Sequence, residues 1–586
     1  MHPAWSWRCQ RSPHGRFRAT PVAWTPAAPP ARQEAPIRSP IPSILICASS
    51  GALVCAPAAF AQSGYFAPRG PEFIVNLGVN YDQTWARVSA DPAGSRWAFS
   101  FNSGQDVYAR VFDLDAKPLT PNLSVNPTLT QHIQDEAEVS LDPVSGNFIV
   151  AFSERFGYDG EIMGIFARIF DANHVPLGNE IQINVVWQAS QWRPLIDNLP
   201  GGGWVIAWSG TWAGDSIFRL VTPDGQFLTG DVLINTYTSG GQTLPDVAVA
   251  PDGRMFFVYV DYSAHGGVGT GTNLWGRLFD ANASPLGPDY PLNTPSYAVG
   301  HQKQPRAAAD GLGNYIVTWE DQTLDGSGTG IYARRFDHDG APIGPEFAVN
   351  TTTAANQLNP HLAADAFGGF VIAWEDWSSG SADIRARRFD PQGNGIGPDF
   401  VVNTTTAGNQ RNPDVEMTWS GEDVLVCWDG PGVSVDAYAQ FFSTYQPPAV
   451  YCTPKTNSQG CAPLLAFTGK PTLTGADDFH VVATQVLNNK LGLFFHGRSS
   501  ANTPFAGGTL CVKPPLVRTP LQHSGGNPPP NDCSGGYDFH ASQAWMASHV
   551  LSAGDTVYAQ YWQRDPGFAP PDNIGLSAGA VFEIRP

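Results

Sequence analysis

The stretch Gly369-Phe370-Val371-Ile372-Ala373-Trp374 decides the fold, because related stretches recur along the chain. Each relative is a short apolar run that closes on an aromatic residue, and successive aromatics lie 51 to 60 residues apart. Apolar runs of this length are typical of strands that are buried on both faces. The chain therefore contains seven related units, whose closing aromatics are Phe101, Phe152, Trp208, Tyr259, Trp319, Trp374 and Trp428.

A second block follows each apolar run, and Tyr332-Ala333-Arg334-Arg335-Phe336-Asp337 is its clearest example. This block alternates polar and apolar residues, and a turn and a short strand that ends in Asn come after it. A Gln opens every unit, and in five units Pro stands three residues later. Each unit is thus predicted to hold four short strands, with the opening residues Gln83, Gln134, Gln191, Gln242, Gln302, Gln357 and Gln410.

Four-stranded units of about this length, repeated four to eight times, are typical of a β-propeller. The sequence therefore predicts an all-β fold in which residues 62–445 form a seven-bladed β-propeller. A linear β-solenoid is the alternative, but it would need shorter repeats.

The two ends of the repeat array complement each other. The last unit lacks a fourth strand, because the chain enters Tyr445-Gln446-Pro447-Pro448 after its third. The segment 72–76, Glu-Phe-Ile-Val-Asn, precedes the first unit and matches the fourth strand at 346–350, Glu-Phe-Ala-Val-Asn. We expect this N-terminal strand to complete the last blade, which removes exposed strand edges and closes the ring.

The units at 72–444 resemble the Gln-x-x-Pro … Trp … Tyr-Ala-Arg-x-Phe-Asp … Val-Asn-Thr repeats of large exported bacterial surface proteins. That resemblance implies a propeller and brings no common activity. The segments 451–458 and 559–567 resemble a cysteine-containing C-terminal module of exported proteins from planctomycete- and myxobacteria-like genomes. The second resemblance implies a role in sorting or attachment.

Export is also predicted from the N-terminus and from the use of cysteine. Residues 1–61 read as a leader, whose apolar stretch ends in Ala59-Phe60-Ala61, so that cleavage is expected before Gln62. Lipid attachment at Cys47 or Cys55 is the alternative, although each follows a bulky residue. Cysteines that cluster near the C-terminus predict two disulfides, as in exported domains, with the nearest pairs Cys452–Cys461 and Cys511–Cys533 expected.

The region 449–586 loses the repeat and alternates apolar runs with Pro-rich loops, which predicts a small disulfide-bridged β-sandwich domain. Its histidines include His480, His496 and His540. They are expected to be scattered surface residues, and a copper or zinc site is the alternative. Cys427 lies outside this domain and is expected to be a buried free thiol.

Residues that recur in every unit are expected to build the blades, whereas a ligand site should break the symmetry. The repeated Arg, Gln and Asn residues are therefore assigned to hydrogen bonds within the propeller, with anion binding by the Arg residues as the alternative. Acidic residues that follow the second strand are the sharper candidates, and we expect them to share one face around the channel mouth. These candidate binding residues are Glu320, Asp321, Glu375, Asp376 and Asp429, with Glu154 and Asp261 at related positions.

Crowded carboxylates invite a hard cation, so Ca²⁺ binding is one hypothesis, and a solvated acidic rim is the other. Aromatic residues beside the acids would suit stacking on a sugar ring, and packing within the loops is the alternative. The binding candidate among them is Trp377, and Trp187, Trp192 and Trp212 are further exposed-looking aromatics.

The net charge of −19 disfavours nucleic acid and anionic lipid as partners, and no later apolar run is long enough to span a bilayer. No catalytic motif of a serine hydrolase, zinc protease or phosphate-binding loop occurs. The sequence predicts a monomeric secreted or surface-displayed binding protein that uses propeller loops to engage a glycan or protein. A propeller glycoside hydrolase and a purely structural envelope protein are the alternatives.

Overall fold

The computed structural model describes residues 66–585, except 79–80, 92–94, 130–131, 156–162, 186–189, 211–213, 264–270, 295–299, 433, 445–447, 474–475 and 553–554. The predicted leader and its cleavage site lie outside the described residues, as do Trp187 and Trp212.

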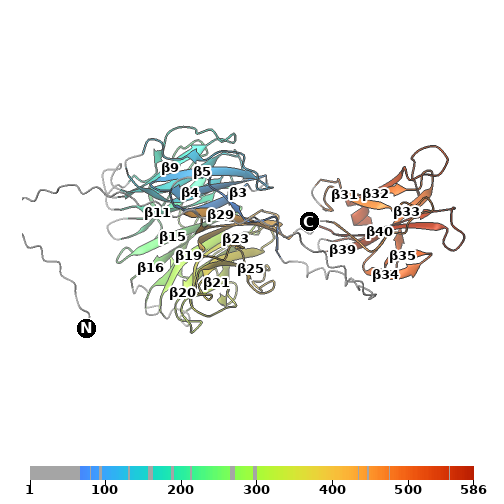
Figure 1. Ribbon diagram of the computed structural model, residues 1–586. Helices are drawn as coiled ribbons and strands as arrows, with labels where there is room; N and C mark the ends of the chain where they lie inside the picture. The colour runs from blue at the N-terminus through green and yellow to red at the C-terminus, as the bar shows by residue number, and fades with distance from the viewer. Residues whose placement is uncertain are drawn as a thin grey trace, which may run out of the picture. The chain divides into compact units, whose positions relative to one another are not determined.

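The described part of the repeat region forms six four-stranded antiparallel sheets and one five-stranded sheet (Figure 1). In each four-stranded sheet three long strands are followed by a short fourth one, as the repeat predicts. The strands of the four-stranded sheets are β3 (Gln83–Ala90), β4 (Arg96–Ser103), β5 (Asp106–Asp113) and β6 (Leu123–Ser124); β7 (Gln134–Leu141), β8 (Phe148–Arg155), β9 (Met163–Phe170) and β10 (Ile181–Gln182); β11 (Trp192–Asn198), β12 (Trp204–Ser209), β13 (Ser216–Val221) and β14 (Val232–Leu233); β15 (Gln242–Val249), β16 (Met255–Asp261), β17 (Asn273–Phe279) and β18 (Tyr290–Pro291); β19 (Gln302–Ala309), β20 (Tyr315–Asp321), β21 (Gly330–Phe336) and β22 (Phe347–Ala348); β23 (Gln357–Ala364), β24 (Phe370–Asp376), β25 (Asp383–Phe389) and β26 (Phe400–Val401).

The five-stranded sheet joins the two ends of the repeat region. It holds β27 (Arg411–Met417), β28 (Asp423–Pro431) and β29 (Val435–Ser443), and both N-terminal strands, β1 (Ala67–Pro68) and β2 (Phe73–Ile74), pair with β29. Phe73 lies opposite Ala439 and Ile74 opposite Tyr438. The expectation that segment 72–76 supplies the missing strand of the last unit is confirmed.

The first strands of the seven sheets form a closed circuit. Each lies beside the first strand of the next sheet along the chain, and β27 lies beside β3. The second strands carry the apolar runs, and their closing aromatics, such as Trp208 and Trp374, are fully buried. These side chains pack into hydrophobic clusters that combine strands of neighbouring sheets. Burial of large aromatic side chains between the sheets is a main source of their stability.

The repeated polar residues hydrogen-bond as the sequence predicts, although their partners extend beyond a single sheet. Arg334 donates from Nε to the Gly344 carbonyl (3.2 Å) and from Nη1 to the Leu292 carbonyl of the preceding unit (2.7 Å). Asn350, two residues after the short fourth strand β22, donates to the opening Gln357 of the next unit (3.2 Å). These repeated side chains therefore join neighbouring units as well as strands of one unit.

Every first strand carries a β-bulge two residues after its opening Gln. The pairing register shifts at this point in all seven sheets. One residue in each bulge adopts a positive φ, between 49° and 57°, so the bulge redirects the strand and leaves its amide free for another partner. These residues are Trp85, Glu136, Arg193, Leu244, Gln304, Asn359 and Asn412.

The C-terminal region forms a six-stranded, a three-stranded and a two-stranded sheet. Residues of the two larger sheets share one hydrophobic core with Met546 of the short helix α1 (Gln543–Ser548). This helix is not predicted from the sequence. The strands are β30 (Ala449–Tyr451), β31 (Leu464–Thr468), β32 (His480–Val486), β33 (Leu491–Gly497), β34 (Ser500–Phe505), β35 (Gly508–Val512), β36 (Val517–Arg518), β37 (Gln522–His523), β38 (Gly535–His540), β39 (Thr556–Arg564) and β40 (Ile574–Glu583).

All four clustered cysteines form disulfides, but the predicted pairing is wrong. The bonds are Cys452–Cys511 and Cys461–Cys533, which join residues 59 and 72 positions apart. Proximity in the sequence misled the prediction, because β35 brings Cys511 against the segment that follows β30. Cys427 is a buried free thiol, as expected. Among the described residues, no helix is long and apolar enough to cross a membrane.

Candidate functional site

The acidic residues singled out in the sequence are buried at one end of the ring of sheets, where the first strands begin and the second strands end. Three of them immediately follow a closing aromatic and accept a hydrogen bond from the bulge amide of the next unit. Glu320 accepts from Asn359 N–H (2.7 Å) and Glu375 from Asn412 N–H (2.8 Å). Asp429 accepts from Trp85 N–H (2.9 Å), across the junction between the last and first units.

The two remaining acids bond within their own units. Asp321 accepts from the side chain of Gln302 (2.9 Å), and Asp376 accepts from that of Gln357 (3.2 Å). Trp377 is half-buried and donates from Nε1 to Glu375 (3.2 Å). These contacts give the acids a role in joining strands and sheets, and ligand binding by them stays a prediction. Among the described residues, no group of three or more His, Cys, Asp or Glu side chains could hold a metal ion.

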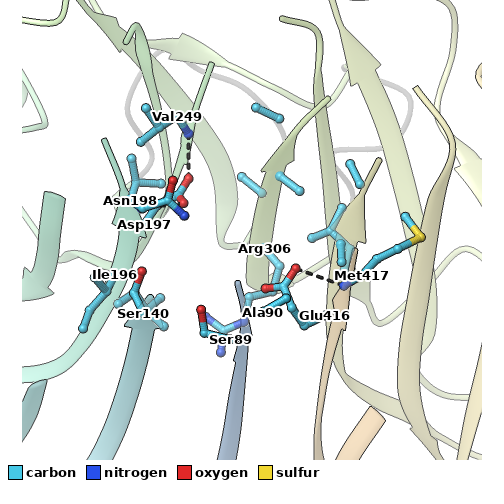
Figure 2. Close-up of a pocket in the computed structure, with 18 of the residues that line it drawn as sticks. Ser89, Ala90, Ser140, Ile196, Asp197, Asn198, Val249, Arg306, Glu416 and Met417 are labelled. Atoms are coloured by element: carbon cyan, nitrogen blue, oxygen red, sulfur yellow. Dashed lines mark hydrogen bonds between the residues drawn. The ribbon is translucent and has the colours of Figure 1, made fainter. Parts of the chain in front are cut away.

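A cavity of about 400 Å³ lies toward the opposite end of the first strands (Figure 2). Residues from the first strands of all seven sheets line it. The residue four positions after the opening Gln is charged or a histidine in six of the seven units. Five of these side chains line the cavity, namely Glu138, Asp246, Arg306, His361 and Asp414, and Arg87 pairs with Glu138 (Nε–Oε2 3.4 Å).

A chain of hydrogen bonds crosses three sheets at the inner end of this cavity. Arg306 donates from Nε to His361 Nε2 (3.1 Å), and His361 Nδ1 lies 2.8 Å from Asp414 Oδ1. Since the Arg306 Nε–H requires an acceptor, His361 carries its proton on Nδ1 and donates to Asp414. Asp414 also accepts from Val88 N–H (2.8 Å).

The protonation states of this chain follow from its surroundings. Burial and the neighbouring Arg306 lower the pKa of His361 to about 3, so the imidazole is neutral at neutral pH. Burial opposes ionisation of Asp414, but its hydrogen bonds and the neighbouring His361 and Arg87 outweigh burial and lower its pKa. Arg306 is only 6% exposed, and no hydrogen bond to the protein is made by its Nη atoms within the described residues.

Two further carboxyl groups face the cavity from different walls (Figure 2). Asp197 on β11 accepts from Val249 N–H (2.8 Å) and Glu416 on β27 accepts at Oε1 from Met417 N–H (3.0 Å). Within the described residues the second oxygen of Glu416 has no hydrogen-bond partner. Burial raises the pKa of Asp197 to about 7 and that of Glu416 to about 8.

The outer end of the cavity is formed by the turns that follow the first strands. Pro143, Pro200 and Pro251 line it, and so does Trp419, which is 42% exposed. The neighbouring wall carries small polar side chains, including Ser89 and Ser140 (Figure 2). The cavity thus combines hydrogen-bond donors, acceptors and one accessible aromatic ring.

The sequence contained a signal for this site that the sequence analysis did not use. Ligand sites were expected to break the symmetry of the repeat, and the fourth position after the opening Gln does so. It reads Arg87, Glu138, Leu195, Asp246, Arg306, His361 and Asp414 along the chain. The position immediately before it holds Pro or Ala in every unit and the position immediately after it holds an aliphatic residue, whereas this one changes in size and charge.

No protein-family model matches the chain, and no curated protein matches it. Solved structures with which it shares similarity include a protein of unknown function from Dyadobacter fermentans (10% identity, 64% of this chain and 98% of that chain covered, TM-score 0.40). A second is the Penicillium chrysogenum alpha-L-arabinanase complexed with arabinobiose (13% identity, 65% of this chain and 99% of that chain covered, TM-score 0.39). A third is the Dos1 propeller (10% identity, 65% of this chain and 96% of that chain covered, TM-score 0.37). These likenesses concern the arrangement of strands alone.

Proposed function

We propose that residues 62–445 form a seven-bladed β-propeller closed by its N-terminal strands, and that the protein is an exported saccharide-binding protein. The saccharide would bind in the 400 Å³ cavity, which we call the cup. The observation that carries the proposal is the cup's lining, in which the Nη atoms of Arg306 and the second carboxyl oxygen of Glu416 make no hydrogen bond to the protein within the described residues.

The mixture of charges in the cup favours an uncharged polyhydroxy ligand. A cation would meet Arg306, and an anion would meet Asp414, whose pKa is lowered. A sugar hydroxyl both donates and accepts hydrogen bonds, so it can satisfy a guanidinium and a carboxyl group at once. Buried polar atoms that a ligand satisfies contribute strongly to specificity.

An accessible aromatic ring supports the same ligand class. Trp419 lies at the outer end of the cup. Its apolar face can pack against the C–H groups of a sugar ring, while hydroxyl groups reach the polar walls. From the sequence, this combination of aromatic and carboxyl groups is expected around Trp377, which lies at the opposite end of the ring.

Two disulfides are typical of a protein that folds in an oxidising, extracellular environment. They support secretion or display on the cell surface. In this proposal the C-terminal module at 449–586 attaches or presents the propeller, which acts as a monomer.

A glycoside hydrolase is the second candidate function, and one observation favours it. Carboxyl groups with opposite pKa shifts line the same cup. Burial raises the pKa of Glu416 to about 8, whereas the burial of Asp414 is outweighed by hydrogen bonds and neighbouring positive groups, which lower its pKa. Such a difference is what an acid and a base in glycoside hydrolysis need. The engagement of Asp414 with His361 and two backbone amides favours a structural role for that carboxylate instead.

Binding and hydrolysis are separated by one experiment on residues 62–586. Cellohexaose, maltohexaose, xylohexaose, mannohexaose and arabinohexaose are titrated by calorimetry, and the same mixtures are assayed for new reducing ends. Binding without new reducing ends supports the binding protein, and new reducing ends that disappear in Glu416→Gln support the hydrolase. Absence of binding to every sugar overturns the proposed function and favours a structural envelope role.

A further inference from the structure

The cup is closed at its inner end by a bond that crosses the ring. Arg193 on β11 donates from Nη1 to Gln304 Oε1 on β19 (2.7 Å). The intervening sheet, which contains β15, contributes Leu244 at the equivalent bulge position. Arg193 therefore reaches past one whole sheet to find its partner, and it lines the small hollow at the inner end of the cup together with bulge residues of other sheets.

Neighbouring bulge residues extend this closure. Gln304 contacts Asn359 (Nε2–Oδ1 3.4 Å), and Asn359 is held by Glu375 (Nδ2–Oε1 2.7 Å). Asn412 is held in the same way by Asp429 (2.7 Å). The acids that the sequence analysis assigned to a binding rim thus position the side chains that close the cup.

The space between this layer and Arg306 is too small for a sugar. The hollow between the bulge residues and Arg306 has a volume of about 10 Å³, which is about the smallest space that holds one water molecule. The cup itself is about forty times larger. In the part of the chain that the structure describes, the opening of the cup is therefore at the end that carries Trp419.

We propose that the cup recognises the terminal residues of an uncharged saccharide chain and excludes the interior of a polysaccharide. This inference rests on the proposed function, because it names which part of a saccharide the same site takes. The first strands of all seven sheets surround the cup, so it has walls on every side. A chain interior has two continuing ends, and both would have to leave through one opening.

Volume and lining agree with a short terminal segment. A cavity of about 400 Å³ lies at the small end of the range for ligand pockets, about 300–1,000 Å³. Arg306 lies at the inner end, where it meets the first sugar residue to enter, and Asp197 and Glu416 lie farther out on the walls. Trp419 meets a residue nearer the opening.

Stoichiometry distinguishes the two modes of recognition. Each hexasaccharide named above is compared by calorimetry with the polysaccharide of the same sugar, for which the number of chains is determined from its reducing ends. An end-binding cup gives a number of bound proteins per linear chain that stays the same, within twofold, between six residues and about a hundred. A site for chain interiors gives a number that rises several-fold with chain length and overturns the inference, although the proposed function survives.

A cyclic saccharide provides a second readout, because it has no ends. For a glucan ligand, the cyclic heptasaccharide of α-1,4-linked glucose is expected to bind at least tenfold more weakly than maltohexaose. Equal affinity for the two overturns end recognition. Absence of binding to every linear oligosaccharide overturns the proposed function instead, so the two failures remain distinct.

Variants locate the effect in the cup. Asp197→Asn and Arg306→Lys should weaken hexasaccharide binding at least tenfold, and circular dichroism and thermal unfolding report whether each variant is folded. Asp115→Asn, at an exposed position on the same domain, serves as the matched control and should leave affinity unchanged. Unchanged affinity in both cup variants, with retained folding, overturns the assignment of the ligand to the cup.

Discussion

Arg110 donates a hydrogen bond from Nη1 to the carbonyl oxygen of Val75 (2.5 Å), a residue of the N-terminal segment. Arg334 and Arg387 make the equivalent bond to the residue that directly follows the preceding unit's fourth strand. Val75, which directly follows β2, therefore occupies relative to the first unit the place that residues directly after the fourth strands occupy in other units. The N-terminal segment therefore closes the ring through the same type of contact that Arg219, Arg334 and Arg387 make to the unit before them.

Removal of the closing strand should destabilise the propeller strongly. Deletion of residues 72–76 removes the pairing with β29 and the Arg110 contact, and it exposes an edge strand. We expect the thermal unfolding midpoint of the repeat domain to fall by at least 10 °C, or the domain to aggregate. An unchanged midpoint would contradict closure by this segment.

The joint between the last and first units depends on Asp429. Its carboxylate accepts from the backbone amides of Trp85 (2.9 Å) and Ala86 (3.1 Å), and loss of an acceptor leaves a buried amide at a cost of about 1–3 kcal/mol. Asp429→Ala should therefore lower the free energy of unfolding by about 2–5 kcal/mol, allowing for partial rescue by water. Asp115→Ala is the control, since its ion pair is exposed and contributes about 0–1 kcal/mol. If Asp429→Ala and Asp115→Ala lowered the free energy of unfolding equally, Asp429 would not hold the last and first units together.

Because the pKa of Glu416 is raised, we expect the stability that depends on this residue to fall as the pH rises. Burial raises this pKa to about 8 from an ordinary value of 4.5, so the folded protein holds the proton more tightly than the unfolded chain. Stability linked to Glu416 is complete below about pH 4.5 and is lost as the pH rises toward 8. Glu416→Gln cannot ionise, so its stability relative to wild type should increase between pH 5 and pH 9 in urea unfolding. A difference that is constant with pH would mean that Glu416 is not held in a desolvated site.

The disulfide pairing has a direct chemical test. Peptide mapping without reduction should recover the pairs Cys452–Cys511 and Cys461–Cys533. A loop of about 60 residues stabilises the folded state by about 4 kcal/mol in the chain-entropy model, so replacing Cys452 and Cys511 together by Ala should lower the unfolding midpoint of the C-terminal domain. Recovery of Cys452 bonded to Cys461 would contradict the structure.

Much of the propeller could be predicted from the sequence because each feature is repeated. The apolar second strands, the opening Gln residues and the Asn residues at strand ends report local geometry that every unit shares. Even the closing strand was detectable, since residues 72–76 copy the pattern of 346–350. The disulfide pairs could not be predicted from the sequence, because they depend on which strands of a non-repeating domain meet in space.

The candidate site was predicted at the other end of the ring from the cup. Glu320 and Glu375 stood out as acids at the ends of strands, and the bulge that turns each into an acceptor for the next unit is invisible in the sequence pattern. Closure of the cup by Arg193 and Gln304 depends on a contact 111 residues apart across the ring. A symmetry-breaking position within the first strand was the usable signal, and its meaning became clear only once the strands were arranged in a circle.

The most direct test of the account compares two tryptophans at opposite ends of the ring. Trp419 lines the opening of the cup, and Trp377 packs beside Glu375 at the closed end, with Arg411 above its ring. The measurement is calorimetric titration of wild type, Trp419→Ala and Trp377→Ala with the hexasaccharide that wild type binds best. The account predicts at least a tenfold loss of affinity, about 1.4 kcal/mol, for Trp419→Ala alone. A loss confined to Trp377→Ala would place the site on the acidic end and contradict the account.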